Sequence, residues 1–161
     1  MIRVVVGLGS SIGSRRSVLQ LAVQAIGAHK NAECLRVSRV YESPPMGSTA
    51  QGAFVNAAVL CEWQGAPVEL LTFLQELERR FGRQQSARWG DRVLDADILW
   101  VEGVKMKTEA LVIPHPGLSS RNFALWPLLD VLPNAVERYG VTTTQQLVEM
   151  KPPAAIGVLA G

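Results

Sequence analysis

The sequence predicts an α+β fold in which helices pack against an antiparallel β-sheet. Three observations lead to this prediction. Residues 2–8 alternate between apolar and other residues over most of their length, as expected of a strand. Two later segments, beginning near Ser14 and near Pro67, carry apolar residues at helical spacing. Strand-like and helix-like segments follow one another in the order β-α-β-β-α-β.

The first half of the chain supplies the first helix and two strands. Ser14 is a suitable N-cap for a helix that extends to about His29. The apolar residues expected on one face of this helix are Val18, Leu21, Ala22, Ala25 and Ile26. Residues 35–42 have the composition of a second strand, and the two prolines in the loop 43–47 end it.

The second half begins with a strand over about residues 54–63. Pro67 suits the first turn of the next helix. The apolar face expected for that helix consists of Leu70, Leu74, Leu77 and Phe81. A polar, arginine-bearing loop over residues 83–92 then leads into a strand at about 94–101.

A segment at 113–116, a short helix from about Ser119 and a weakly patterned tail complete the chain. We therefore expect a ferredoxin-like two-layer sandwich with an antiparallel sheet and a C-terminal appendage. The length of 161 residues fits one domain, with its core at about 2–133 and the appendage at about 134–161.

The composition indicates a soluble, cytoplasmic protein, and we expect a monomer, although no feature of the sequence determines the oligomeric state. With 16 basic and 14 acidic residues, the net charge of +2 is too small to indicate nucleic-acid binding. No apolar run is long enough for a membrane span or has the order of a signal peptide. Cys34 and Cys61 lack metal-ligand spacing and are expected to be buried thiols in a reducing compartment.

The sharpest chemical signal is the pair Asp95 and Asp97. Residues two apart on a strand point to the same face, so both carboxylates share one side of the sheet. Two like charges on one face repel unless a cation lies between them, and Mg²⁺ is bound by one or two carboxylates together with substrate phosphates. The alternative is a solvated acidic pair at the start of a strand.

Basic residues surround this pair in the sequence. Arg83, Arg88 and Arg92 precede it in one loop, and His115 and Arg121 follow it. Guanidinium groups match phosphate oxygens, so arginines near a metal-binding pair of acids favour a polyphosphate site over a solvated basic loop.

Two further groups of residues are of interest. Phe54 and Asn56 share one strand face, where a ring and an amide suit a flat heterocycle, and Phe123 could stack from the opposite side. The glycine-rich segment 7–13 matches neither a dinucleotide fingerprint nor a P-loop, so we assign it a turn and no direct chemistry.

Taken together, these residues resemble the 6-hydroxymethyl-7,8-dihydropterin pyrophosphokinase family from Gly7 to about Pro133. The most diagnostic stretch is Arg88-Trp89-Gly90-Asp91-Arg92-Val93-Leu94-Asp95-Ala96-Asp97-Ile98-Leu99. Other matching segments are 8–13, 41–47, 54–58, 113–116 and 121–125. The resemblance implies transfer of pyrophosphate from ATP to the pterin hydroxymethyl group in folate synthesis, with no nucleic-acid or membrane partner.

The resemblance also implies a role for each matching residue. Two Mg²⁺ ions that arrive with ATP would be held by Asp95 and Asp97, and catalysis would involve Arg83, Arg92, Asp95 and Asp97. The residues expected at the pterin are Ser43, Pro44, Met46, Phe54, Asn56, Trp89, Asp95 and Phe123. Those expected at ATP are Gln75, Glu78, Arg83, Arg88, Trp89, Arg92, Ile98, His115 and Arg121.

Three positions depart from the family pattern. Ala96 is smaller than the usual apolar residue, Gln85 replaces a frequent arginine, and Asp91 replaces a proline. The two loop changes affect rate and affinity more than reaction type. Two rival interpretations stay open at this point: an RNA-binding module with the same order of elements, and a family member with weakened catalysis.

Overall fold

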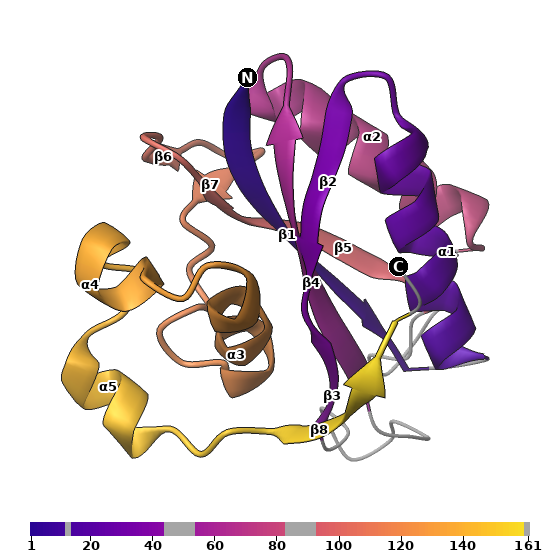
Figure 1. Ribbon diagram of the computed structural model, residues 1–161. Helices are drawn as coiled ribbons and strands as arrows, with labels where there is room; N and C mark the ends of the chain where they lie inside the picture. Colours follow the sequence, from indigo (N-terminus) through magenta and orange to yellow (C-terminus); the bar gives the residue numbers. More distant parts are fainter. Residues whose placement is uncertain (12–13, 44–53, 83–92, 160–161) are drawn as a thin grey trace.

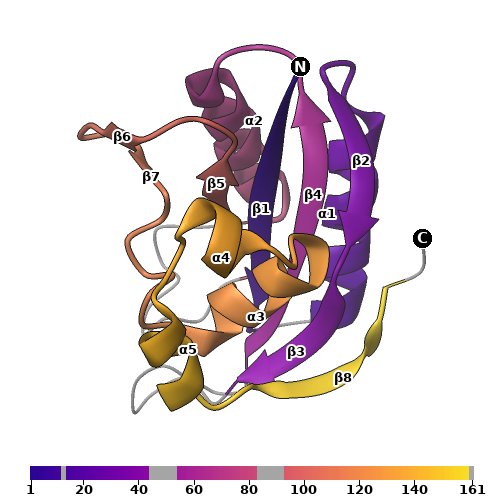
Figure 2. The same ribbon diagram turned by 60° about the vertical axis from the view of Figure 1, so that its left-hand side comes forward.

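The polypeptide forms three layers, with an antiparallel sheet between two groups of helices (Figures 1 and 2). The structure is a computed structural model and describes residues 1–11, 14–43, 54–82 and 93–159. The predicted mixture of helices and antiparallel strands is confirmed. The prediction of two layers is wrong, because helices C-terminal to the β-α-β-β-α-β unit cover the second face of the sheet.

The elements follow the predicted order except that the second predicted strand is divided in two, and they then continue beyond it. The strands of the central sheet are β1 (Ile2–Ser10), β2 (Ala32–Val37), β3 (Arg39–Ser43), β4 (Phe54–Trp63), β5 (Asp95–Val101) and β8 (Ala154–Val158). The helices are α1 (Arg15–Ala28), α2 (Pro67–Arg80), α3 (Asn122–Val131), α4 (Ala135–Tyr139) and α5 (Thr144–Glu149). A small hairpin consists of β6 (Met106–Lys107) and β7 (Val112–Ile113).

The central sheet has the order β5-β1-β4-β3-β8. The strand β2 is outside this order and pairs with the part of β4 that β3 does not cover. Every neighbouring pair is antiparallel. The single strand expected at 35–42 is divided into β2 and β3 at Ser38, which is buried. The hydroxyl of Ser38 accepts from the Ala58 backbone N–H at 2.8 Å, and its own N–H donates to the Ala58 carbonyl at 2.9 Å. The break therefore stays attached to β4.

One face of the sheet packs against α1 and α2 in a continuous apolar core. Val4, Val6 and Leu8 of β1 point into it, and Leu70, Leu74 and Leu77 of α2 do so as predicted. The prediction for α1 is wrong at Leu21, which is 51 % exposed, because the buried side chains of that helix lie at 18, 19, 22, 23 and 26. Ser14 is the N-cap residue, although its side chain makes no capping bond within the described segment.

The other face packs against α3 and α4 in a second core. Leu125, Leu128 and Val131 of α3 contact Val5 of β1 and Leu60 of β4 in this cluster. This core covers the part of the sheet near Val5, and it stops short of Gly7 and Gly9 farther along β1.

The tail expected to be weakly patterned contains β8, which extends the sheet beside β3. Its side chains are exposed, and backbone pairing holds it in place. Arg16 of α1 adds hydrogen bonds to the carbonyls of Ile156 at 2.8 Å and Val158 at 3.0 Å. The chain end is thus attached to both β3 and α1.

Both cysteines are free thiols, as predicted, and lie opposite each other on β2 and β4. Cys61 is buried and Cys34 is half-buried. Burial raises the pKa of the Cys61 thiol to about 12, with a smaller contribution from Cys34. No described helix combines the length and the apolar composition that a membrane crossing requires.

Candidate active site

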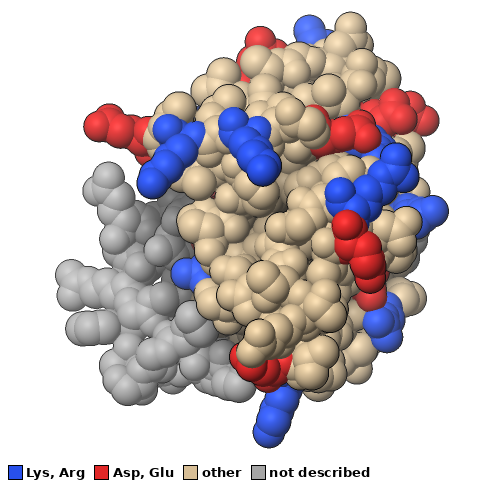
Figure 3. Space-filling model, turned by 90° about the vertical axis from the view of Figure 1, so that its left-hand side faces the viewer, with Lys and Arg blue, Asp and Glu red and all other residues tan. Residues whose placement is uncertain are grey.

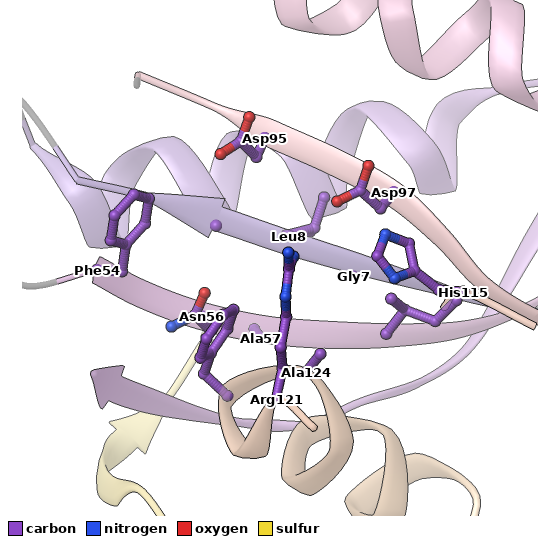
Figure 4. A pocket seen from close by; sticks show the side chains of 13 residues that line it. Gly7, Leu8, Phe54, Asn56, Ala57, Asp95, Asp97, His115, Arg121 and Ala124 are labelled. Atoms are coloured by element: carbon purple, nitrogen blue, oxygen red, sulfur yellow. The ribbon is translucent and has the colours of Figure 1, made fainter. Parts of the chain in front are cut away.

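A cavity of about 240 Å³ lies on the α3 face of the sheet, beyond the edge of the second core (Figure 4). Its walls come from β1, β4, β5, the segment before α3 and the first turn of α3 itself. The residues that line it are Gly7, Leu8, Gly9, Phe54, Asn56, Ala57, Asp95, Asp97, Leu99, His115, Arg121, Phe123 and Ala124.

The floor of the cavity depends on two glycines of β1. Gly9 pairs with Asp95 on one side and with Asn56 on the other, and Gly7 pairs with Asp97. A Cβ atom on Gly9 would lie 3.1 Å from Asn56 Oδ1, and one on Gly7 would lie 2.9 Å from Leu99 Cδ1. The absence of side chains at these positions therefore leaves room for a ligand between β5 and β4.

The two carboxylates lie on β5, at the edge of the cavity. Asp95 is half-buried and Asp97 is exposed, and both point to the α3 face as their alternation predicts. Ala96, between them, packs into the opposite core. The Ala96 N–H donates to the buried carboxylate of Glu78 at 3.0 Å, so α2 fixes the backbone of β5 at the centre of the acidic pair.

An aromatic ring and an amide lie side by side on β4, at the end of the cavity near β3. Asn56 is buried, and its Nδ2 donates to Ser43 Oγ at 3.1 Å. Phe54 is two residues away on the same strand, and Phe123 contributes a second ring from α3. These three side chains bound one end of the cavity, here called the slot, which offers two aromatic rings and a hydrogen-bonding amide.

His115 is held by two backbone contacts. Its N–H donates to the Leu99 carbonyl at 2.9 Å, which attaches it to the open edge of β5. Its Nδ1 accepts from the Gly117 N–H at 3.0 Å. The neutral ring therefore carries its proton on Nε2, which leaves Nε2–H as a donor.

Arg121 occupies the N-cap position of α3, and its guanidinium lies 6.0 Å from the centre of the Phe123 ring. In Figure 4 its side chain extends from α3 toward the strands, across the cavity from Asp95 and Asp97. Gly117 makes this placement possible, since a Cβ there would lie 2.9 Å from Arg121 Cδ and 3.2 Å from His115 Cε1. A guanidinium and an imidazole N–H donor thus face two carboxylates across an open space.

The structure brings together most of the described site residues that the sequence indicates. Those at the cavity are Phe54, Asn56, Asp95, Asp97, His115, Arg121 and Phe123. Ser43 supports Asn56 without lining the cavity. Predicted residues that lie outside the described part of the chain are Pro44, Met46, Arg83, Arg88, Trp89 and Arg92, and the departures at Gln85 and Asp91 also lie there.

Three predicted ATP contacts do not line this cavity. Glu78 is buried under β5 and binds Ala96, and Gln75 is exposed on the same helix. Both are on α2, which packs on the opposite face of the sheet. The side chain of Ile98 belongs to that core as well, so a side-chain contact between Ile98 and a ligand in the cavity is excluded.

The sequence assigns no chemical role to several residues that line the cavity. Gly7 is predicted at the overlap of the strand 2–8 and the turn 7–13, and Gly9 in that turn, yet both lie within β1 and form the floor. The two glycines are two residues apart, as are Asp95 and Asp97. This equal spacing is a sequence feature from which the pairing of each glycine with one aspartate could be predicted. Leu99 and Ala124 gave no such signal, because each is an ordinary apolar residue.

The two carboxylates at the cavity are the residues that could hold a cation. No described part of the chain gathers three or more His, Cys, Asp or Glu side chains that could hold a metal ion. Two carboxylates at an open cavity agree with Mg²⁺, which usually keeps water or substrate oxygens as its other ligands. The residues present therefore fit a divalent cation with further oxygen ligands.

Comparison with known proteins identifies the family. The family model described as 7,8-dihydro-6-hydroxymethylpterin-pyrophosphokinase (HPPK) matches residues 5–133. The chain belongs to the HPPK family. A relative from Methylorubrum extorquens, named 2-amino-4-hydroxy-6-hydroxymethyldihydropteridine pyrophosphokinase, is 37 % identical over 152 residues, which are 94 % of this chain and 96 % of that protein. A Bacillus subtilis protein of the same name is 38 % identical over 126 residues, 78 % of this HPPK chain and 75 % of its own.

Solved structures agree with the fold. The HPPK-DHPS protein of Plasmodium falciparum has a TM-score of 0.55 at 14 % identity, over 87 % of this chain and 45 % of that one. A second HPPK-DHPS structure, in complex with substrates, has a TM-score of 0.61 at 12 % identity, over 87 % of this chain and 47 % of that one. The chain therefore spans about half the length of these two-part proteins, and the likeness concerns the fold alone.

Proposed function

We propose that this chain transfers the pyrophosphoryl group of ATP to the hydroxymethyl group of 6-hydroxymethyl-7,8-dihydropterin, releasing AMP and the pterin diphosphate for folate synthesis. One observation carries the proposal. On a chain of the HPPK family, one cavity contains a slot for a flat heterocycle and a pair of carboxylates that face the cationic side chain of Arg121. The slot would bind a pterin, and the carboxylates together with Arg121 would bind a metal-bound triphosphate.

The pterin would lie between Phe54 and Phe123, against Asn56. Two rings can stack on its faces, and the amide of Asn56 can pair with its edge. Because Nδ2 of Asn56 already donates one hydrogen bond to Ser43, the amide is held in one orientation. By the resemblance, Pro44, Met46 and Trp89 would complete this pocket. Asp95 and Asn56 both pair with Gly9, so they lie in one row across the sheet. The hydroxymethyl group would therefore be directed toward the acidic pair.

The triphosphate would lie at the other end of the cavity. Asp95 and Asp97 would hold two Mg²⁺ ions, which when bound would neutralise phosphate charge and align the triphosphate for in-line transfer. Arg121 would pair with phosphate oxygens, and the Nε2–H of His115 would donate to another. The resemblance adds Arg83, Arg88 and Arg92 at the phosphates, and Gln75 and Glu78 near the nucleotide.

The transfer itself would need positioning more than covalent participation by the protein. The pterin hydroxyl oxygen would attack the β-phosphorus, the bond from that phosphorus to the α–β bridging oxygen would break, and AMP would leave. The hydroxyl proton would be released. Charge developing on the bridging oxygen would be stabilised by the cationic side chains at the cavity, of which Arg121 is the described example.

The proposal extends to the setting of the enzyme. The strand order and directions support a ferredoxin-like core, completed by the α3–α5 layer, in one domain. We further propose a monomeric, cytoplasmic enzyme, and the free, buried thiol of Cys61 supports the cytoplasmic location.

The rival interpretations are weaker. An RNA recognition module binds RNA on the open face of its sheet, whereas here α3 packs on that face. Figure 3 shows positive and negative side chains interspersed around the described part of the face formed by α3–α5, in contrast to the basic surface that RNA needs. A catalytically weakened member of the family is disfavoured because the cavity retains both aspartates, Asn56 and Arg121.

The test is to incubate the purified chain with ATP, Mg²⁺ and the dihydropterin and to quantify AMP, ADP and pterin diphosphate, with EDTA as the control. We expect AMP and pterin diphosphate in equal amounts, and neither with EDTA. ADP in place of AMP would retain the phosphate site and overturn pyrophosphoryl transfer. Without product, and without pterin binding in the presence of an unreactive ATP analogue, the proposed function would be wrong.

A further inference from the structure

A second network of polar side chains lies outside the cavity, where α3 meets β3. Asp130, near the end of α3, accepts three hydrogen bonds from Arg39: from the backbone N–H at 3.1 Å, from Nε at 3.1 Å and from Nη2 at 2.9 Å. It accepts a fourth from the hydroxyl of Tyr41 at 2.8 Å. One carboxylate therefore joins the helix to two residues of the strand.

Both sides of this network continue into the proposed pterin slot. On β3, Arg39, Tyr41 and Ser43 alternate along one face, and Ser43 accepts the hydrogen bond from Asn56. Tyr41 is also the direct cross-strand partner of Asn56. On α3, Asp130 follows Phe123 by two helical turns, so the two side chains project from the same side of the helix.

We infer that Asp130 is a positioning residue that sets the distance between α3 and the strands β3 and β4, and with it the width of the slot between Phe123 and Asn56. This inference rests on the proposed function, which places the pterin in that slot. Asp130 does not line the cavity and touches no substrate. It acts through α3, which carries Phe123 at one wall of the slot, and through β3, which is paired with β4 and so with Asn56 at the other wall.

The network is well suited to hold a fixed geometry. Tyr41 is only 1 % exposed, so its hydroxyl depends on Asp130 for a partner, and the Arg39 guanidinium meets the carboxylate with two nitrogens. The Arg39 side chain also lies over the Tyr41 ring at 5.4 Å. Elsewhere the contact between α3 and the sheet is apolar and would tolerate sliding, whereas these directional bonds specify one position.

The first test compares Asp130→Asn with the wild-type chain in steady-state kinetics. A wider slot should raise the KM for the pterin about tenfold, because small misplacements of substrate-positioning groups have large effects. The KM for ATP and kcat at saturating pterin should change less than the pterin KM does, since Asp95 and Asp97 lie on β5, away from α3, and of the described groups proposed to contact the phosphates only Arg121 is attached to that helix. Tyr41→Phe, which removes one of the four bonds, should give a smaller change in the same direction.

Two control variants separate positioning from general stability. Val23→Ala creates a gap in the core between α1 and the sheet. A low concentration of urea, added to the assay of whichever variant is more stable, gives it the same thermal midpoint as the other. Glu137→Gln removes an exposed carboxylate from α4. We expect both to keep the wild-type KM for the pterin. If Val23→Ala raises that KM as much as Asp130→Asn does, the role of Asp130 is stability alone and the inference is wrong.

A second readout does not depend on activity. In amide hydrogen exchange, Asp130→Asn should increase exchange in the first turn of α3, at Phe123–Leu125, with little change in α1. Unchanged protection of that turn would overturn the inference. A wild-type chain without activity would count against the proposed function instead, and the exchange result would still decide whether Asp130 positions α3.

Discussion

The two faces of the central sheet carry different parts of the protein's chemistry on the same strands. On the α1–α2 face, Val6, Leu8 and Ile98 fill a continuous core. On the α3 face the positions next to them are Gly7, Gly9 and Asp97, which leave a cavity. Consecutive residues of β1 and β5 thus alternate between a packed side and an open side.

This contrast shows how a small sheet can be both rigid and functional. The core on one face fixes the strands, and the register between β1, β4 and β5 then fixes the spacing of the carboxylates and the amide on the other. Residues of the core face should therefore control stability with little direct effect on turnover. Residues of the cavity face should control turnover with little effect on stability, and the following substitutions test this separation.

The largest effect is expected at the acidic pair. Asp97→Ala should reduce turnover by a factor of about 10³ or more, since it removes one of two groups proposed to hold the metal–triphosphate complex. Asp97 is exposed, so the free energy of unfolding should change by less than about 0.5 kcal/mol. Product formation and urea denaturation measure the two quantities, with Glu109→Ala as a matched surface control. Near-normal turnover in the folded variant would contradict the assignment.

The largest effect on stability is expected in the opposite core. Leu74 is fully buried between α2 and the sheet, so Leu74→Ala should lower the free energy of unfolding by about 2–5 kcal/mol. The kcat per folded molecule should stay within about twofold of wild type. Val68→Ala, on the exposed side of the same helix, should leave both nearly unchanged. A fall in kcat that exceeds the unfolded fraction would show that the two faces are not separable.

A smaller effect is expected on the cavity floor. Gly9→Ala places a methyl group 3.1 Å from Asn56 Oδ1, so it should raise the KM for the pterin about tenfold, or about 1.4 kcal/mol. Gly27→Ala is the matched control, since its Cβ would meet only Cys34 Cβ at 3.8 Å in α1. That control should leave kinetics unchanged and raise stability by about 0.5–1 kcal/mol through helix propensity. An unchanged pterin KM in Gly9→Ala would show that the floor is not part of the slot.

The smallest effect concerns pH and the link between α3 and β3. Burial acts to raise the pKa of Asp130, but hydrogen bonds from Arg39 and Tyr41 outweigh it and lower the pKa overall. Burial, followed by the bond to Asp130, raises the pKa of Tyr41 to about 12. The Asp130 contribution to stability is thus present above its unfolded pKa of about 4 and lost as pH falls through the lower folded value. The Tyr41 contribution is present below about pH 10 and lost as pH rises through about 12.

Between about pH 5 and 9, then, the difference in thermal midpoint between wild type and Asp130→Asn should be constant. It should shrink below about pH 4, where the Asp130 carboxylate of the unfolded chain takes up a proton while the native carboxylate, whose pKa is lower, is still charged. Thermal unfolding across this range measures the difference. A strong change near pH 7 would mean that another group controls the link.

The fold was predictable where one periodicity dominates a long segment. Leu70, Leu74 and Leu77 mark α2 at helical spacing, and the alternation in β1 marks a strand. The third layer is not predicted as a layer, because α4 and α5 are short. The strand β8 is not predicted either, because all its side chains are exposed and its pairing depends on the backbone. Strand alternation from Ala96 and Ile98 would place Trp100 in the α1–α2 core, but a register shift beside Val5 turns it to the α3 face.

The site was predictable where residue type and strand spacing act together. Asp95 with Asp97, and Phe54 with Asn56, point to one face because each pair is two residues apart on a strand. Glu78 shows the limit of this reasoning, since its bond to Ala96 depends on how α2 lies under β5. The roles of Arg83, Arg88, Trp89 and Arg92 remain predictions from the resemblance, because those residues lie outside the described part of the chain.

The carboxylates of the cavity face are proposed to hold a metal–nucleotide complex without contributing to the core. The most direct measurement is calorimetric titration of an unreactive ATP analogue, with and without Mg²⁺, into wild type and into the variant with both Asp95→Asn and Asp97→Asn. We expect Mg²⁺ to strengthen binding to the wild type, and to lose this effect in the variant, whose thermal midpoint should be equal or higher. Mg²⁺-dependent binding that survives in the folded variant would contradict the account.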